Sequence, residues 1–199
     1  MTDFPDYCRA TNAAYEILQK YKGDFPCVDV YQLLSSLPNV AIFTYSAMAN
    51  KLNVSFREFY SNFASSNHGF TIYDTQKNKY LVCYNEFKDN TTVKFTLAHE
   101  LAHIILKHNE DNERTDKEAN CCARNIICPI PIVNNYQLKS VYDYMSCFNI
   151  SEPMAKAAID LAENDNYNIT RQNYNAVDEL AYFNISGYSP YELYGSFYR

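Results

Sequence analysis

The spacing of apolar residues predicts several short helices in the first third of the chain. Apolar side chains recur at helical spacing over residues 5–22, and Gly23 ends that segment. A second helix is expected over residues 29–37, because Pro38 disfavours helical backbone in the residue before it. Two helical pieces follow between residues 46 and 63. The N-terminal part of the chain is therefore predicted to be largely helical.

Three segments have the β-branched and aromatic composition that is typical of strands. They cover residues 40–45, 69–74 and 79–84. The last two flank a polar turn at residues 75–78, which predicts a β-hairpin. We expect the hairpin and the strand at 40–45 to form a small, mostly antiparallel sheet.

The motif with the clearest chemical meaning lies at residues 91–108, a segment without Gly or Pro that is predicted to be one helix capped by Asn90. It contains H-E-x-x-H, which places His99 and His103 one turn apart on the same face. Two imidazoles in that arrangement can each give a nitrogen to one Zn²⁺ ion. Glu100 follows His99 directly and can act as a general base toward the attacking water.

The alternative interpretation of this motif is a helix with two buried, hydrogen-bonded histidines. The small side chains of Ala98 and Ala102 leave room for a metal ion and so favour metal binding. Leu106 and Asn109 stand where the metzincin pattern requires Gly and His, which excludes that class. His108 is expected to be a solvated residue at the helix end and not a ligand.

A catalytic zinc site needs a third protein ligand. A charged loop follows the motif helix, and a second helix is predicted over residues 115–128, stopped by Pro129. A tight return between the two helices could bring Glu118 to the metal. Thr115 and Glu118 also form a capping-box pattern, so Glu118 could instead close its own helix. Spacing leaves both roles open, and the other acidic candidates are Glu110, Glu113 and Asp116.

The rest of the chain is predicted to be helical at residues 138–148 and 151–163, followed by an Asn- and Tyr-rich tail from residue 164 that packs over the core. A DNA-binding helix-turn-helix at 138–163 is disfavoured, because its second helix offers a single lysine, Lys156, for phosphate contacts.

Composition narrows the class of partner and the compartment. The chain has 199 residues and a net charge of −6, which argues against nucleic acid as a direct partner. Seven cysteines without C-x-x-C spacing indicate reduced thiols. The acidic start has no signal-peptide core, and no apolar run approaches the length of a membrane span. We expect a cytoplasmic protein.

At these motifs the sequence resembles the ImmA/IrrE family of metallo-endopeptidases. The shared features are F-T-x-A-H-E-x-x-H from Phe95, E-A-N from Glu118, a proline after the helix at Pro129, and Phe148-Asn-Ile-Ser151. The resemblance implies one Zn²⁺ per chain, with Glu118 as the third ligand beside His99 and His103. It also implies a cytoplasmic protease that cleaves a helix-turn-helix repressor and so derepresses a mobile-element or stress operon.

Together these features predict an α+β fold in two parts. Residues 1–130 are expected to form a zincin-like core with the small sheet, the H-E-x-x-H helix and the ligand-bearing helix. Residues 131–199 are expected to form a helical C-terminal extension that packs on the core.

Two functions are compatible with this fold. In the first, the chain is a zinc endopeptidase with His99, His103 and Glu118 on the metal and Glu100 as the base. An extended peptide substrate would pair with a sheet edge, for which the strand at 79–84 is the expected candidate. The alternative is a zinc-containing regulatory module that sequesters a repressor without cleaving it. An intact Glu100 argues against the alternative, because a binding module needs no general base.

Overall fold

The computed structural model describes residues 4–186 and shows an α+β fold, with ten helices and a three-stranded sheet in that range. The elements before the motif helix are α1 (Tyr7–Leu18), α2 (Val30–Ser35), β1 (Val40–Thr44), α3 (Tyr45–Leu52), α4 (Phe56–Asn62), β2 (Gly69–Asp74) and β3 (Lys79–Tyr84). The later elements are α5 (Asn90–Ile105), α6 (Glu113–Ile127), α7 (Ile130–Asn135), α8 (Val141–Phe148), α9 (Glu152–Asn168) and α10 (Arg171–Ser186).

The sheet is mixed, and not mostly antiparallel as predicted. Its strand order is β1-β3-β2, with β2 antiparallel to β3 as the hairpin required. However, β1 runs parallel to β3, in a register that pairs Val40 with Tyr80. A parallel pair needs a long crossover connection, and residues 45–78, which include α3, α4 and β2, provide it. The central strand is therefore β3, and the edge strands are β1 and β2, so the prediction of an edge at residues 79–84 was wrong.

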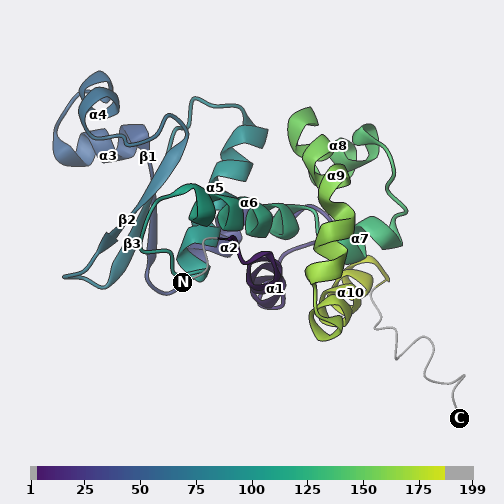
Figure 1. Cartoon of the computed structure of the whole chain (residues 1–199). Coiled ribbons are helices and arrows are strands. Elements are labelled where there is room, and N and C mark those ends of the chain that lie inside the picture. The colour runs from purple at the N-terminus through teal and green to yellow at the C-terminus, as the bar shows by residue number, and fades with distance from the viewer. Residues whose placement is uncertain (1–3, 187–199) are drawn as a thin grey trace, which may run out of the picture.

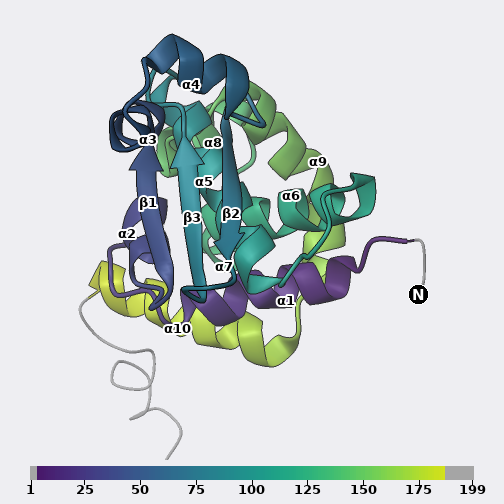
Figure 2. The same cartoon turned by 90° about the vertical axis from the view of Figure 1, so that its left-hand side faces the viewer.

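The helices cover the sheet unequally. Figure 2 shows the three strands in front, with α5, α6 and α9 stacked behind them and α4 at one end. In Figure 1 the layers run from the sheet through α5 and α6 to the group formed by α7–α10, with α1 beneath α6. Within this arrangement α5 packs on both β2 and β3, and α6 packs on both α5 and α1. The motif helix is thus held between the sheet and a second layer of helices.

The sheet has a buried cluster of apolar side chains on each face, and β3 contributes to both clusters. Val82 is fully buried in the main cluster, against α5 and the helices behind it. Its neighbour Cys83 is fully buried on the other face, where it packs with Tyr45 and Phe59 from α3 and α4. Successive side chains of a strand point to opposite faces, so one strand serves both clusters.

The C-terminal segment is more regular than predicted. Helix α9 continues through the expected boundary at residue 163 to Asn168. Beyond it, α10 packs on α1 and α7 and buries Val177 and Ala181. The predicted tail is therefore helical up to residue 186, because these apolar positions find partners in the core. The remainder of the predicted tail, residues 187–199, lies outside the described residues.

Candidate metal centre

Helix α5 presents the two motif histidines together. Asp89, and not Asn90, caps the helix, since its carboxylate accepts a hydrogen bond from the backbone N–H of Thr92. One turn apart near the C-terminal end, His99 and His103 direct their Nε2 atoms at each other, 3.0 Å apart. Ala98 and Ala102 are fully buried in the main core and do not line the cleft, so the prediction that they leave room for the metal ion was wrong. The predicted placement of the two histidines on one face of the helix is confirmed.

The third donor beside this pair is Asp116, from the first turn of α6. Its Oδ1 lies 3.9 Å from His99 Nε2 and 3.6 Å from His103 Nε2. These three side chains are a group that could hold a metal ion. Donors of a tetrahedral zinc site at ordinary bond lengths are separated by about 3.3 Å. The observed separations of 3.0, 3.6 and 3.9 Å lie around that value, so the donor set fits zinc with small side-chain adjustments.

The other ring nitrogen of each histidine has its own partner. His99 Nδ1 lies 2.9 Å from Oδ1 of Asn120, and His103 Nδ1 lies 3.0 Å from Nδ1 of His108. An amide oxygen can only accept, so His99 donates from Nδ1 and keeps a lone pair on Nε2. Asn120 stands four residues after Asp116 and therefore on the same face of α6. One turn of α6 thus supplies both a donor to the metal site and an orienting group behind it.

Burial keeps the site histidines neutral. It is the main reason why the pKa of His99 lies below its usual value and why the pKa of His103 falls to about 4. The neighbouring His99 and His108 lower the pKa of His103 further. Imidazole must be neutral to bind a metal ion, so at neutral pH both rings are in the protonation state that coordination requires.

Glu100 lies in the same cleft as the histidines and is almost completely buried, with 7% of its surface exposed. The hydroxyl of Thr71, on β2, donates a hydrogen bond of 2.7 Å to Glu100 Oε2. Burial raises the pKa of Glu100 to about 7, although the Thr71 hydrogen bond lowers it. A carboxyl group that titrates near neutrality is suited to accept and return a proton.

The structure does not bring Glu118 to the histidine pair. Its carboxylate is buried, 2% exposed, and accepts hydrogen bonds at 3.0 Å from the backbone N–H of Asp6 and from His108 Nε2. Two residues turn a helix by about 200°, so Asp116 and Glu118 cannot face the same group. The predicted capping box with Thr115 is also absent, because Asn112 caps α6 and pairs reciprocally with Thr115. Glu118 therefore lies behind the histidine pair, where its partners are His108 and the backbone of Asp6.

His108 was predicted to be solvated, and this was wrong. Its side chain is 4% exposed and lies between His103 and Glu118. The cause is the way in which α5 ends. Lys107 adopts a left-handed conformation with φ of 54°, and the N–H of His108 donates to the carbonyl of His103. This is the pattern of a Schellman motif, which turns the residue after the helix back over its last turn.

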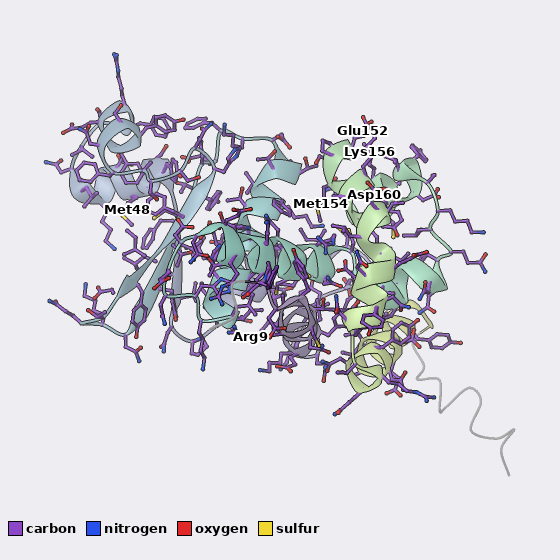
Figure 3. All side chains as sticks on the ribbon, in the orientation of Figure 1. Arg9, Met48, Glu152, Met154, Lys156 and Asp160 are labelled. Atoms are coloured by element: carbon purple, nitrogen blue, oxygen red, sulfur yellow. The ribbon has the colours of Figure 1, made fainter. Side chains whose placement is uncertain are left out.

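The site opens into a cleft of about 1280 Å³. Edge strand β2 forms one wall, and the first turns of α9 form another. In Figure 3, Met154 lies on the side of α9 that faces α5 and α6. The residues that line these walls include Gly69, Phe70, Thr71, Tyr73, Phe95, Ser151, Pro153, Met154 and Ala157. Peptide-sized molecules can therefore reach the histidines between β2 and α9.

Sequence reasoning placed His99, Glu100 and His103 together, but it assigned no role to Asn120, Thr71 or His108 in the site. One signal was available: Asp116 and Asn120 stand four residues apart, which mirrors the spacing of the two histidines on α5. Thr71 and His108 had no comparable signal. Thr71 is positioned by a strand from another part of the chain, and His108 by a helix end that lacks glycine.

A histidine pair on one helix, a carboxylate on the next and a buried glutamate beside them define the class of H-E-x-x-H metal-dependent hydrolases. Residues 51–186 match the family of IrrE N-terminal-like domains, a family of metallopeptidases. The chain belongs to this family, as the motifs predicted, and is a metallopeptidase. Comparison with curated proteins gives no match. None of the helices within residues 4–186 is long and apolar enough to cross a membrane.

Proposed function

We propose that the chain is a zinc-dependent endopeptidase with a zincin-like core and one Zn²⁺ held by His99, His103 and Asp116. The observation that carries this proposal is the meeting of the three donors beside Glu100 in a cleft bounded by a strand edge. The orienting partners of the two histidines add to it, because fixing Nδ1 leaves Nε2 free toward the donor set. Asp116 thus takes the role that the resemblance gave to Glu118.

The chemistry follows from the positions of these groups. Zinc, when bound, supplies a Lewis acid that polarises the scissile carbonyl and acidifies water. Glu100 takes the proton from the attacking water and passes it to the leaving amine. Thr71 holds Oε2 of Glu100, which keeps the carboxylate in one orientation during both transfers.

The cleft suits an extended peptide. β2 is an edge strand, and its residues 69–71 and 73 line the cleft. An extended segment can add to such an edge through backbone hydrogen bonds, while pockets for side chains give selectivity. Met154 and Ala157 of α9, together with Phe95, offer apolar contacts on the other side.

The proposed substrate is a helix-turn-helix repressor. The motif resemblance supports it, and its cleavage would relieve repression of a mobile-element or stress operon. We further propose that the protein is cytoplasmic, that neither nucleic acid nor membrane is a direct partner, and that residues 131–199 form an extension packed on a core at 1–130. The negative net charge supports the exclusion of nucleic acid.

Incubation of the purified protein with the repressor encoded beside it tests the proposal. Cleavage should require Zn²⁺, stop when a chelator is added, and fall by on the order of a hundredfold or more in Glu100→Gln. Tight binding of an uncut repressor by the zinc-loaded wild type would favour the sequestering module instead. Cleavage that persists in Glu100→Gln would remove Glu100 from the mechanism.

A further inference from the structure

A line of hydrogen bonds runs from the interior to the metal site. Glu118 Oε2 lies 3.0 Å from Nε2 of His108, and Nδ1 of His108 lies 3.0 Å from Nδ1 of His103. Nε2 of His103 then faces His99 and Asp116. His108 and Glu118 are thus connected to the metal site through the ring of His103, although neither belongs to the donor group.

The direction of each hydrogen bond follows from the chemistry of its members. An ionised carboxylate only accepts, so Nε2 of His108 must carry the proton that it shares with Glu118. A neutral His108 then has only a lone pair on Nδ1, and His103 must donate to it from its own Nδ1. This leaves a lone pair on Nε2 of His103. Only this tautomer of His103 can bind a metal ion at the nitrogen that faces the site.

The carboxylate of Glu118 is fixed in position by several neighbouring groups. The backbone N–H of Asp6 donates to Oε1 at 3.0 Å, and the guanidinium groups of Arg9 and Arg114 lie 3.9 and 4.0 Å from its oxygens. Arg9 also donates to the carbonyl of Leu106, at the end of the motif helix. Figure 3 shows Arg9 close to the layer formed by α5 and α6. These contacts surround both carboxylate oxygens of Glu118 and fix the side chain in the position from which it accepts the hydrogen bond of His108.

We propose that His108 and Glu118 are positioning residues that hold His103 in the tautomer with its Nε2 lone pair directed at the metal. Without His108, the ring of His103 can place its proton on Nε2 and donate it to Nε2 of His99, 3.0 Å away. That arrangement would block both metal-facing nitrogens. The part of this inference that concerns zinc affinity rests on the proposed function, whereas the part that concerns the tautomer does not.

The tautomer can be measured on the metal-free protein by the nitrogen chemical shifts of the His103 ring. The wild type should show a protonated Nδ1 and a bare Nε2. His108→Phe keeps a ring of similar size but offers no acceptor, so His103 should shift its proton to Nε2. A bare Nδ1 on His103 in the wild type would overturn the proposal, and so would an unchanged tautomer in His108→Phe.

Zinc affinity, measured by competition with a chelator, gives the second readout. Loss of an orienting partner typically weakens metal binding by about 10–100-fold, and we expect a loss in that range for His108→Phe. Glu118→Gln retains an oxygen that can accept from His108, so its loss should be no greater than that of His108→Phe. Glu113→Gln is the matched control, because Glu113 is exposed at the start of the same helix and pairs with Lys117. It should bind zinc like the wild type.

The order of the effects separates the two roles of Glu118. If Glu118 were itself a zinc ligand, Glu118→Gln would lose far more affinity than His108→Phe, and that result would overturn the proposal. Denaturation curves of the variants confirm that each affinity is measured on folded protein. A wild type that binds no zinc would overturn the proposed function, and the tautomer measurement would then decide this inference alone.

Discussion

The environment of Glu100 shows how one residue is adapted to two protonation states. Burial raises the pKa of Glu100 to about 7, whereas the hydrogen bond from Thr71 to one carboxylate oxygen lowers it. Burial of a carboxyl group penalises its charged form, while a nearby metal dication favours it. The metal-free protein therefore carries a cost at neutral pH that a bound ion would offset.

A comparison of the wild type with Glu100→Gln should reveal this cost in the pH dependence of the free energy of unfolding. The pKa of Glu100 is raised in the folded protein from 4.5 to about 7, so folding holds this proton more tightly. The resulting stabilisation is complete below pH 4.5 and is lost as the pH rises through about 7. A glutamine has no such dependence.

Between about pH 4 and pH 8, the free energy of unfolding should therefore shift in favour of Glu100→Gln by up to about 3 kcal/mol. Chemical denaturation of both metal-free proteins across this range measures the shift. Thr71→Val is a useful companion variant, because loss of the hydroxyl should raise the pKa of Glu100 further. Parallel curves for wild type and Glu100→Gln would show that the carboxyl is not perturbed.

Asp116, one of the acidic candidates in the sequence, is the carboxylate that lies beside the two histidines, where the resemblance had indicated Glu118. Replacing Asp116 with asparagine keeps the shape but removes the negative charge from the donor group. We expect Asp116→Asn to weaken zinc binding by at least about tenfold and to abolish cleavage. Chelator competition measures the affinity. Glu110→Gln, at the rim of the same cleft, should bind zinc normally, and equal losses in both variants would point to a general charge effect.

At the scale of elements, the C-terminal end of α5 and the N-terminal end of α6 position the residues around the histidine pair. Helix α5 ends in a left-handed Lys107 that folds His108 back, and α6 begins at a cap formed by Asn112 and Thr115. The start of α6 fixes the direction in which Asp116, in its first turn, points. A change at the cap should therefore affect stability and the metal site together.

Asn112→Ala removes the side chain that accepts from the backbone N–H groups of Arg114 and Thr115. Loss of such a cap costs about 1 kcal/mol, within a range of roughly 0.5–2 kcal/mol. Thermal or chemical unfolding should show this loss, together with weaker zinc binding caused by fraying of the first turn. Asn109→Ala alters an exposed residue of the same loop and should change stability by less than about 0.5 kcal/mol. Similar losses in both variants would contradict the cap assignment.

At the scale of the whole molecule, a buried ion pair ties the C-terminal helices to α6, the helix that carries Asp116. Arg124 of α6 donates to both oxygens of Asp165 on α9, each at 2.7 Å. Their side chains are 11% and 4% exposed. The same helix α9 contributes Met154 to the cleft, so this pair fixes the position of a cleft wall relative to the metal site.

Asp165→Ala should leave Arg124 buried without a counter-charge and destabilise the protein by about 3–5 kcal/mol. The double variant Arg124→Met/Asp165→Leu removes both charges and should recover most of that loss. Glu152→Ala serves as the control, since it breaks an exposed ion pair with Lys156 on the same helix and should cost less than about 1 kcal/mol. A small effect of Asp165→Ala would show that Arg124 reaches solvent.

The sequence alone determined what depends on residues close together in the chain. Helices α1–α6, α8 and α9 follow from periodicity and turn composition, which act over a few residues, and so do the hairpin and the facing of His99 and His103. Helices α7 and α10 were not predicted. Glu100 could be placed beside the histidines for the same reason, because its position relative to them is set within one turn. The family motifs then indicated the reaction, and the match over residues 51–186 agrees with them.

The tertiary structure decided what depends on how elements pack. The rotation of α6 is set by the burial of Ala119 and Cys122 against the core, and this turns Glu118 inward and leaves Asp116 beside the histidines. The direction of β1 depended on its pairing with a strand about forty residues away, which local composition does not encode. His108 is buried because Lys107, a non-glycine residue in the left-handed conformation, ends α5, and because the carboxylate of Glu118 offers a hydrogen-bond acceptor to its ring.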